Sequence, residues 1–477
     1  MQSAQDYDLI VIGSGPAGEK GAAQAAYFDK RVALIERDSV LGGASCNTGA
    51  LSSKTLRESA LALSGFRSRE LFGVDLAVRR GATVHDFLTH ERMVVAAERE
   101  AIRENVRRHK INTYHGLASF IDRYTVRVDT EGGEPLFLRG EVILIATGSS
   151  PIRPPQFCFD DRRVWDSDQI VNLDFMPGRM AVIGGGVIGC EYACTFAALG
   201  VDVCLVDGRT ELLDFVDRDV WAVLETAMMG LGIRFLTGER VLECSSSAAA
   251  VTLSLSSGRT VEVDAVLVAA GRIANTEQLN LKAAGLTADG RGRVAVNEHY
   301  QTEVSHIYAA GDVIGFPALA STSMEQARVA MVDAFNLKYK KSAAPVLPLG
   351  VFTIPEVSVA GETERSLTAQ RIPYIAGRAY YDGNARGKII GDRKGLLKLL
   401  FREHDMKLLG VSVVGESASE LVHIGVIALM LDADHDLFIE TCFNYPTLGQ
   451  LYKYATYDAM GKRRGAPLAG VTSARAE

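Results

Sequence analysis

The sequence lacks the marks of a stapled, secreted or membrane-embedded chain. Its seven cysteines are scattered, odd in number and never arranged as Cys-x-x-Cys, which argues against a disulfide framework and for reduced thiols. The longest apolar runs, such as GVIALML, fall far short of the roughly 20 residues that a membrane-spanning helix needs. The first residues, MQSAQDYD, are polar and acidic and do not resemble a signal peptide. We therefore expect a cytoplasmic protein without membrane insertion.

The sequence also has no excess of positive charge. It contains 51 Lys and Arg against 58 Asp and Glu, a formal net charge of -7, so it offers no overall attraction for nucleic acid or an anionic membrane. Charged residues make up 23% and apolar residues 47%, which excludes disorder as a description of the whole chain. At about 150 residues per domain, 477 residues correspond to roughly three domains.

Glycine is the residue in excess, at 46 of 477 residues against a usual share of about 7%, and part of this excess lies near the N terminus. There the segment YDLIVIGSGPAGEKGAAQAAYFDKRVALIERD predicts a strand, a glycine turn, a helix and a second strand. In this context Gly13, Gly15 and Gly18 form the fingerprint of a dinucleotide site, because they allow a tight turn, the approach of a pyrophosphate and close helix packing. Glu36 ends the second strand, where an acid binds a ribose hydroxyl.

The same unit recurs in the segment MAVIGGGVIGCEYACTFAALGVDVCLVDGR. Its glycines are Gly184, Gly186 and Gly189, and Asp207 follows at the spacing that separates Gly13 from Glu36. Two fingerprints at equal spacing make chance a poor explanation, so the sequence predicts two dinucleotide sites.

Each unit is followed by an apolar run that ends in glycine. EVILIATG ends at Gly148, DAVLVAAG ends at Gly271, and a later run, HIYAAGD, ends at Gly311 and Asp312. A strand that stops at glycine suits the close approach of a nucleotide or of another backbone segment. From about Pro345 the chain predicts strands in VFTIPEVSVAG, KGLLKLLF and KLLGVSVVG and a helix in ELVHIGVIALML.

Together these features resemble the FAD- and NAD(P)-linked disulfide reductase superfamily along essentially the whole chain. The phrases NTGALSSKTLRESAL, GDVIGFPALASTSMEQ, SASELVHIG and FNYPT are most similar to its soluble pyridine nucleotide transhydrogenases, which are close to the dihydrolipoamide dehydrogenases. The resemblance implies an α/β chain with two Rossmann-like dinucleotide-binding domains and a C-terminal α+β dimerisation domain. The implied boundaries are 1–150 and 276–344 for the two parts of the FAD-binding domain, 151–275 for the NAD(P)-binding domain, 345–465 for the interface domain and 466–477 for a mobile tail.

The resemblance further implies FAD on the first unit, NAD or NADP on the second, and a homodimer. It places Asp312 at the FAD ribitol and Glu36 at the adenosine ribose. The residues that it assigns to cofactor binding are Gly13, Gly15, Gly18, Glu36, Gly43, Lys54, Gly148, Asp312, Gly184, Gly186, Gly189, Asp207, Arg209 and Gly271. The residues that it assigns to catalysis are Lys54, Glu191 and Tyr445. No metal ion is expected.

The sequence departs from the family where the disulfide reductases carry their redox centre. They have GGxCxxxxC followed by a short tail ending in Ser-Lys, whereas this chain has GGASCNTGALSSK, with Ser45 and Ala50 at the cysteine positions. No internal disulfide can therefore accept electrons. Cys46 lies one residue along, a rotation of about 100° on a helix, so we interpret it as a buried thiol, with a flavin contact as the alternative. Cys190 and Cys194 share a helix face and are interpreted as packing residues rather than metal ligands.

The C-terminal base of the disulfide reductases is also missing. Their His-Pro motif is followed by Glu five residues after the His, whereas this chain has Tyr445 and Gln450 in NYPTLGQ. Because a tyrosine has a reference pKa of about 10 and an amide does not titrate, these two residues do not form an acid–base pair at neutral pH.

The residues of the hydride path are present. Lys54 resembles the lysine beside the flavin N5, and Glu191 resembles its carboxylate partner beside the nicotinamide; the alternative for each is a solvated charge. Asp207 favours NAD, because it can accept from the ribose 2′-hydroxyl. Arg209 could turn over a 2′-phosphate and allow NADP as well, or it could simply be solvated.

These features predict an FAD-dependent oxidoreductase that passes a hydride from NADPH to NAD⁺ through flavin N5 without a redox disulfide. One alternative is an NAD(P)H diaphorase that reduces a quinone or oxygen. Another is a flavin-bound scaffold or redox sensor without turnover, since both cysteines, the base and the usual Pro at Ser52 are lost. A dihydrolipoamide dehydrogenase is rejected.

Overall fold

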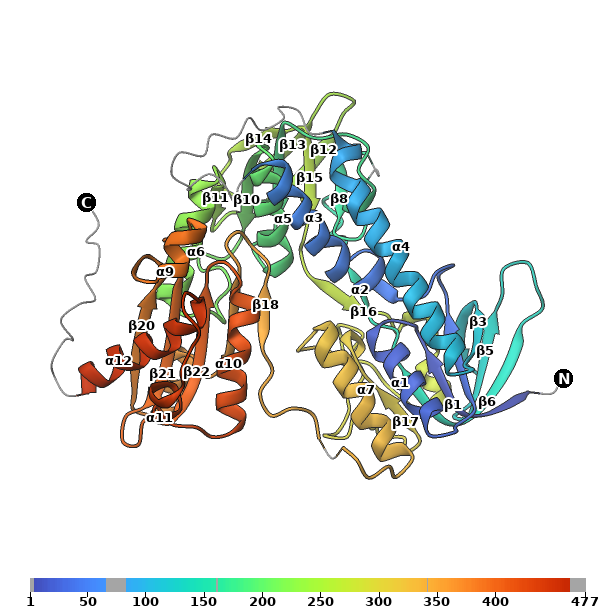
Figure 1. Cartoon of the computed structure of the whole chain (residues 1–477). Helices are drawn as coiled ribbons and strands as arrows, with labels where there is room; N and C mark the ends of the chain where they lie inside the picture. Colours follow the sequence, from blue (N-terminus) through green and yellow to red (C-terminus); the bar gives the residue numbers. More distant parts are fainter. Residues whose placement is uncertain (1–3, 66–82, 160–161, 341, 464–477) are drawn as a thin grey trace.

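The computed structural model describes residues 4–65, 83–159, 162–340 and 342–463. It contains two sheets with parallel strands at their centres and a C-terminal antiparallel sheet, each with helices packed against it. In Figure 1 they form an arch, with the second parallel sheet at the top and the other two as its legs. The tail predicted for residues 466–477 lies outside the described residues. The helices in the described part of the chain are all too short or too polar to span a lipid bilayer.

The first sheet has the strand order β3-β2-β1-β6-β5-β4, and β17 also pairs with β6. β1, β2, β3, β6 and β17 run parallel, so their carboxyl ends meet at one edge. Leu9, Ile10 and Val11 of β1 are fully buried, as expected for a parallel strand that is covered on both faces. The strands are β1 (Gln5–Ile12), β2 (Val32–Glu36), β3 (Asn112–His115), β4 (Leu117–Phe120), β5 (Thr125–Asp129), β6 (Leu136–Ile145) and β17 (Ile307–Ala309).

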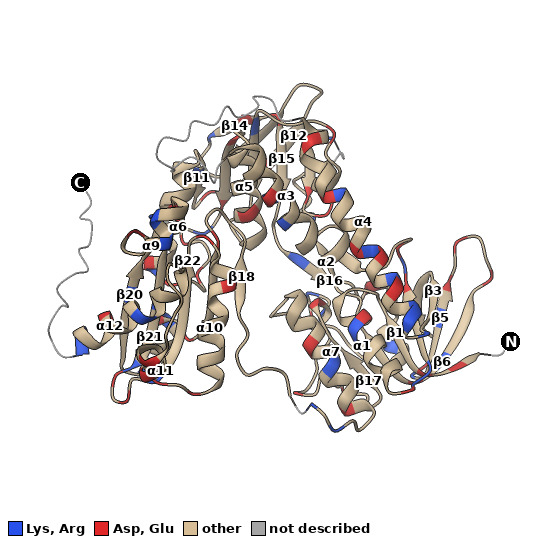
Figure 2. Cartoon of the chain, in the orientation of Figure 1, with Lys and Arg blue, Asp and Glu red and all other residues tan. Residues whose placement is uncertain are grey.

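Among the described residues, five helices belong to this part of the chain. α1 and α7 pack side by side, and α4 crosses the sheet edge as a long amphipathic helix (Figure 1). α4 begins at a capping box, in which Thr83 and Asp86 exchange side-chain and backbone hydrogen bonds, and along it acidic and basic residues alternate (Figure 2). The helices are α1 (Pro16–Tyr27), α2 (Gly43–Asn47), α3 (Ala50–Leu63), α4 (Val84–Arg108) and α7 (Ala320–Ala334).

The second sheet has the order β11-β10-β9-β15-β8 and is parallel throughout. A three-stranded antiparallel sheet, β12-β13-β14, adjoins it, and the pair β16-β7 joins the second unit to the first. The elements are β7 (Ser149–Pro151), β8 (Val164–Asp166), β9 (Arg179–Ile183), α5 (Val187–Ala198), β10 (Asp202–Asp207), α6 (Arg218–Gly230), β11 (Arg234–Thr237), β12 (Val241–Ser246), β13 (Val251–Leu255), β14 (Thr260–Val263), β15 (Ala265–Val268) and β16 (Arg272–Ala274).

The C-terminal sheet is antiparallel, in the order β18-β19-β22-β21-β20, with α10 and α12 packed against it. Its elements are β18 (Leu349–Val351), β19 (Val357–Gly361), α8 (Glu364–Gln370), β20 (Tyr374–Tyr380), α9 (Ala385–Ile390), β21 (Leu396–Arg402), β22 (Leu408–Val414), α10 (Ala418–Met430), α11 (Asp436–Glu440) and α12 (Leu451–Arg463). The 3₁₀ helices of the chain include η2 (Ile170–Asn172), η3 (Glu277–Leu279), η4 (Leu281–Ala284), η5 (Asp312–Ile314), η6 (Tyr381–Gly383) and η7 (Leu448–Gln450). The predicted α/β class and both predicted βαβ units are confirmed.

Candidate functional site

A cavity of about 1170 Å³ opens at the carboxyl edge of the first sheet. Its walls come from the first glycine turn, from α2 and α3, from the chain after β6 and β17, and from α5 of the second unit. The carboxyl end of parallel strands is the usual ligand side of such a sheet, because loops and helix N-termini converge there. The fold therefore supplies a long cavity that is bounded by both nucleotide-type units.

The first glycine turn forms one wall of the cavity, and a side chain at its key glycines would clash with the backbone. Gly13 has a φ of +101°, and a Cβ added to it would lie 2.4 Å from the carbonyl oxygen of Ala146. A Cβ on Gly18 would lie 1.8 Å from the oxygen of Gly13, so helix α1 could not approach the turn. A Cβ on Gly43 would lie 2.7 Å from Cα of Gly15. This bare backbone at the N-terminus of α1 suits a pyrophosphate, which the amides and the helix dipole would stabilise.

Glu36 lies at the end of the cavity where β2 stops, and only some of the hydrogen-bond acceptor positions of its carboxylate are occupied. Oε2 accepts hydrogen bonds from the amide and the hydroxyl of Ser14, at 2.9 and 2.5 Å. Oε1 accepts from the amide of Asp38 at 3.0 Å. A carboxylate has about four acceptor positions, so Glu36 keeps room for one further donor, such as a ribose hydroxyl.

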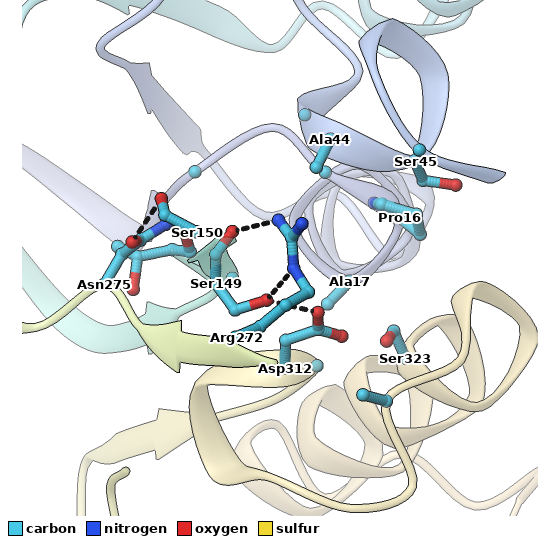
Figure 3. A pocket seen from close by; sticks show the side chains of 18 of the residues that line it. Pro16, Ala17, Ala44, Ser45, Ser149, Ser150, Arg272, Asn275, Asp312 and Ser323 are labelled. Carbon is cyan, nitrogen blue, oxygen red and sulfur yellow. Dashed lines mark hydrogen bonds between the residues drawn. The ribbon is translucent and has the colours of Figure 1, made fainter. Parts of the chain in front are cut away.

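Asp312 lies deeper in the cavity and is connected to a short hydrogen-bond chain (Figure 3). Ser149 Oγ donates to Asp312 Oδ2 at 2.6 Å, and Arg272 Nε donates to the same hydroxyl at 2.8 Å. A second nitrogen of Arg272 donates to the carbonyl of Ser149 at 2.7 Å, while Arg272 Nη1 pairs with Asp168 at 3.0 Å. These hydrogen bonds orient the Asp312 carboxylate and leave its Oδ1 without a protein donor among the described residues.

Lys54 and Glu191 meet in the cavity although 137 residues separate them. Lys54 Nζ donates to Glu191 Oε2 at 2.7 Å; the lysine side chain is 30% exposed and the glutamate side chain 6%. Phe352 fixes both partners, because its amide donates to Glu191 Oε1 at 2.8 Å and its ring lies 4.9 Å from Lys54 Nζ. The result is a positioned ammonium group at the junction of α3, α5 and the chain after β18.

The second glycine turn repeats the geometry of the first. Gly184 has a φ of +103°, and a Cβ on Gly189 would lie 1.8 Å from the oxygen of Gly184. Asp207 accepts from the Gly185 amide at 2.7 Å and from the backbone and guanidinium of Arg209, at 2.7, 3.1 and 2.8 Å. Burial disfavours the charge on Asp207, but the hydrogen bonds from Arg209 and Gly185 outweigh it, so the pKa of this carboxyl lies below its usual value.

The two family cysteine positions both line the cavity, but they hold no sulfur: they are Ser45 and Ala50. Cys46 is buried and packs with Ile102 and other apolar residues, on the side of α2 away from the cavity. Burial and the charge of Glu98 raise the pKa of the Cys46 thiol. The interpretation of Cys46 as a buried thiol therefore agrees with its position.

The second cysteine pair is part of the core. Cys190 and Cys194 are fully buried in the apolar cluster around α5, and neither belongs to a possible metal cluster in the described part of the chain. Burial raises the pKa of both thiols, that of Cys194 to about 12. The packing interpretation of this pair is confirmed.

The cavity unites half of the predicted site residues. Those that line it are Gly13, Gly15, Glu36, Gly43, Lys54, Gly148, Glu191 and Asp312. Those that lie elsewhere are Gly18, Gly184, Gly186, Gly189, Asp207, Arg209, Gly271 and Tyr445. Tyr445 is 75% exposed in the loop before η7, so its catalytic assignment stays a prediction.

Sequence reasoning missed three residues of the cavity: Ser149, Arg272 and Phe352. Ser149 and Arg272 follow directly after the predicted glycines 148 and 271, so their place at the two strand ends was the available signal. Phe352 lies in the strand-like segment VFTIPEVSVAG and acts partly through its backbone amide, which no side-chain pattern reveals.

Comparison with known proteins agrees with this geometry. Residues 7–334 match the family described as pyridine nucleotide-disulphide oxidoreductase, and residues 347–456 match the dimerisation domain of the same family. Among solved structures, the chain is similar to LpdA of Mycobacterium tuberculosis, with a TM-score of 0.88 and 26% identity over 95% of this chain and 99% of that one. It is also similar to the Cu(II) complex of the HOCl-induced flavoprotein disulfide reductase RclA of Escherichia coli, with a TM-score of 0.86, 26% identity and the same coverage.

Curated relatives match over nearly their full length. The soluble pyridine nucleotide transhydrogenase of Mycobacterium bovis (strain BCG / Pasteur 1173P2) is 43% identical over 96% of this chain and 98% of its own. The protein of the same name from Colwellia psychrerythraea is 39% identical over 97% of this chain and the whole of its own. The chain belongs to the pyridine nucleotide-disulphide oxidoreductase family, and it is an oxidoreductase that uses FAD and NAD(P).

Proposed function

We propose that this protein is a transhydrogenase that passes a hydride from NADPH to NAD⁺ through FAD without a redox disulfide. The observation that carries the proposal is the Lys54–Glu191 pair, which lines the same cavity as Ser45 and Ala50, the two positions where no sulfur is available. The names of the curated relatives, soluble pyridine nucleotide transhydrogenases at 37–43% identity, support the same activity.

The cavity residues fit FAD along its whole length. Glu36, with one open acceptor position, would bind the adenosine ribose, and the bare turn from Gly13 to Gly18 would hold the pyrophosphate. Asp312, oriented by Ser149, would bind the ribitol through its open Oδ1. With these assignments, the ring system of FAD would lie at the end of the cavity that Lys54 and Glu191 line.

FAD, when bound, supplies a two-electron carrier that takes a hydride from one nicotinamide nucleotide and gives it to another. Lys54 supplies a fixed positive charge at this end, which favours the more negative, reduced form of the cofactor. Glu191 and the ring of Phe352 hold the ammonium group in one place, so its charge needs no rearrangement during the reaction. The nicotinamide nucleotides would bind in turn at the second glycine unit, beside α5, whose Glu191 reaches the cavity.

The chemistry needs no thiol and no C-terminal base. A hydride moves with its electron pair, so neither a disulfide nor a proton shuttle takes part in the exchange between two nicotinamides. The loss of both cysteine positions at Ser45 and Ala50, and of the His-Glu pair at Tyr445 and Gln450, is therefore compatible with turnover.

The test is anaerobic stopped-flow reduction of the FAD-loaded protein by NADPH, followed by mixing with thionicotinamide NAD⁺. We expect the flavin absorbance to bleach and then to recover as the thionicotinamide product appears. Recovery with quinone or oxygen but never with the NAD⁺ analogue would indicate the diaphorase instead. A flavin that neither NADPH nor NADH bleaches would refute an oxidoreductase role and favour the scaffold.

A matched pair of variants tests the role of the ammonium group. Lys54→Met should slow flavin reduction by at least about tenfold, the scale of loss when a charge beside the reacting atoms is removed. Lys20→Met is the control, because Lys20 is also 30% exposed and pairs with a carboxylate of 7% exposure, Glu19, outside the cavity. Equal rates for both variants would exclude Lys54 from the hydride path.

A further inference from the structure

The tip of the second unit, where β10 and β11 end, places a second arginine beside Arg209. β10 and β11 are parallel neighbours, with Asp207 opposite Thr237. The turns that follow are hydrogen-bonded to each other: the Gly238 amide donates to the Arg209 carbonyl and the Glu239 amide to the Asp207 carbonyl, both at 3.1 Å. This pairing brings the next residue, Arg240, against the turn that carries Asp207 and Arg209.

The side chain of Arg240 packs over Gly208, and its guanidinium group forms no ion pair with the described residues. A Cβ on Gly208 would lie 3.1 Å from both Cγ and Nε of Arg240, so the missing side chain at 208 leaves the space that the arginine uses. Arg240 is exposed, and no carboxylate of the described residues forms an ion pair with it. The carboxylate of its neighbour Glu239 is turned to the hairpin before β14, where Ser256 and Ser257 donate to it.

Asp207, in contrast, has no free acceptor position. Oδ1 accepts from the amide and Nε of Arg209, and Oδ2 accepts from the Gly185 amide and from Nη2 of Arg209. These four donors fill the roughly four acceptor positions of a carboxylate. A ribose hydroxyl can therefore reach Asp207 only after the Arg209 side chain, which is 53% exposed, has turned away.

We propose that Arg240 is the second cation of a 2′-phosphate subsite and determines whether this protein accepts NADP(H) besides NAD(H). The inference rests on the proposed function and concerns the same nucleotide site. With NAD(H), Arg209 leaves and Asp207 accepts from the ribose 2′-hydroxyl. With NADP(H), the phosphate, which carries about −1.5 to −2 charges at pH 7, binds between Arg209 and Arg240. Arg209 alone could not offset both this charge and that of Asp207; the uncommitted charge of Arg240 supplies the difference.

Binding of nucleotide fragments tests the subsite without any hydride transfer. The probes are 2′,5′-ADP, which carries the 2′-phosphate, and 5′-ADP, which lacks it, both measured by calorimetry on the FAD-loaded protein. Arg240→Gln should weaken 2′,5′-ADP roughly ten- to a hundredfold, the loss expected for a charge-assisted phosphate contact, and should leave 5′-ADP within about twofold. It should also flatten the salt dependence of 2′,5′-ADP binding, since one charge contact is lost.

Arg234→Gln is the matched control, because Arg234 is an exposed arginine on β11 that pairs with Asp202 and lies away from the turn. It should change neither affinity. The proposal is overturned if Arg240→Gln binds 2′,5′-ADP as tightly as the unaltered protein does. It is also overturned if the substitution weakens the binding of both fragments equally. Steady-state kinetics gives a second readout: the KM for NADPH should rise while the KM for NADH stays. The fragments cannot react, so their binding does not depend on turnover. If Arg240→Gln weakens 2′,5′-ADP binding but the protein does not catalyse transhydrogenation, only the proposed function is refuted.

Discussion

A single position along α2 separates a residue that faces the cavity from one that faces the core. Ser45 lines the cavity, whereas Cys46 packs against Ile102 of α4. The helical rotation of about 100° per residue accounts for the difference. Cys46 is buried and is not among the residues that line the cavity, so we do not expect its thiol to replace the lost cysteine pair.

From this position we predict that the Cys46 thiol is unreactive in the folded protein. Its burial and raised pKa keep it in the unreactive thiol form at pH 8, while Cys158 is exposed and should react quickly. Iodoacetamide labelling followed by peptide mass spectrometry should modify Cys46 at least about a hundredfold more slowly than Cys158, since labelling needs local unfolding. Cys46→Ala should keep the rate of flavin reduction by NADPH. A long-wavelength charge-transfer band that disappears in this variant would show instead that the thiol contacts the flavin.

The residues that sequence reasoning could assign are those with a local physical constraint. Gly13 and Gly184 need positive φ values and Gly18 and Gly189 need an absent side chain, so spacing alone predicts both turns. Phe352 and Arg240 carry no such local mark. Their positions depend on contacts across more than one element, with Glu191 and Gly208 respectively, which only the folded chain brings together.

At the scale of elements, the second unit is tied to the C-terminal sheet by a buried lysine. Lys398 of β21 has no exposed surface, and its Nζ lies 3.0 Å from Asp217, 2.8 Å from Asp219 and 3.0 Å from Glu364. The three carboxylates are close enough to hold a metal ion, but the ammonium group already lies among them. Arg378 of β20 adds a second cation to Asp219 at 2.7 Å. The cluster joins the N-terminus of α6 to α8, β20 and β21.

Removing this ammonium group should destabilise the protein strongly. Lys398→Met leaves the buried carboxylate of Asp217 without its cationic partner, which costs about 3–5 kcal/mol of the free energy of unfolding. Urea unfolding followed by fluorescence measures the loss. Lys407→Met is the control, because Lys407 pairs with the exposed Asp432, a type of pair worth about 0–1 kcal/mol. Similar losses for both variants would mean that the buried cluster is no stronger than a surface pair.

The same cluster predicts a loss of stability at alkaline pH. Burial disfavours the charge of Lys398, but the hydrogen bond that it donates to Asp219 and the charge of Asp217 outweigh this effect, so the pKa of Lys398 lies above its usual value. A pKa that is raised on folding adds stability that is complete below the unfolded pKa and is lost as the pH rises through the folded one. The difference in unfolding free energy between the unaltered protein and Lys398→Met should therefore stay constant from pH 7 to about 10 and shrink above the reference lysine value of about 10.4. A difference that already shrinks between pH 7 and 9 would contradict this.

The elements themselves could be predicted where apolar runs or helical periodicity define them, as for β1, α1, β21, β22 and α10. The small sheet β12-β13-β14 was not predicted, because its strands are only four to six residues long and two of them, β12 and β14, lack a regular alternation of buried and exposed residues. The link through Lys398 was not predicted either, since a lysine in the run KGLLKLLF gives no sign of the carboxylates that face it from α6 and α8.

At the scale of the whole molecule, an apolar surface at the end of α10 is left uncovered by the residues that the structure describes. Ile427 and Leu431, one helical turn apart at the end of α10, are 59% and 68% exposed, and Met430 beside them is 54% exposed. The turn of residues 446–449 borders the first half of α10 across a hollow of about 420 Å³. Figure 1 shows α10 on the inner side of the C-terminal leg, facing the opening of the arch. An apolar patch of this kind in a domain that matches a family dimerisation domain points to a second copy of the chain as its cover.

We predict a homodimer that depends on this surface. Ile427→Asp would place a charge among the apolar groups of the interface, where it has no partner, and the cost of several kcal/mol per buried ion should dissociate the pair. Light scattering after size exclusion should then give a mass near the 51.4 kDa of one chain instead of twice that value. Leu242→Asp is the control, since Leu242 is 63% exposed on β12 of the second unit and should leave the mass unchanged. If Ile427→Asp keeps the larger mass while Leu242→Asp lowers it, the dimer forms through the second unit and not through α10.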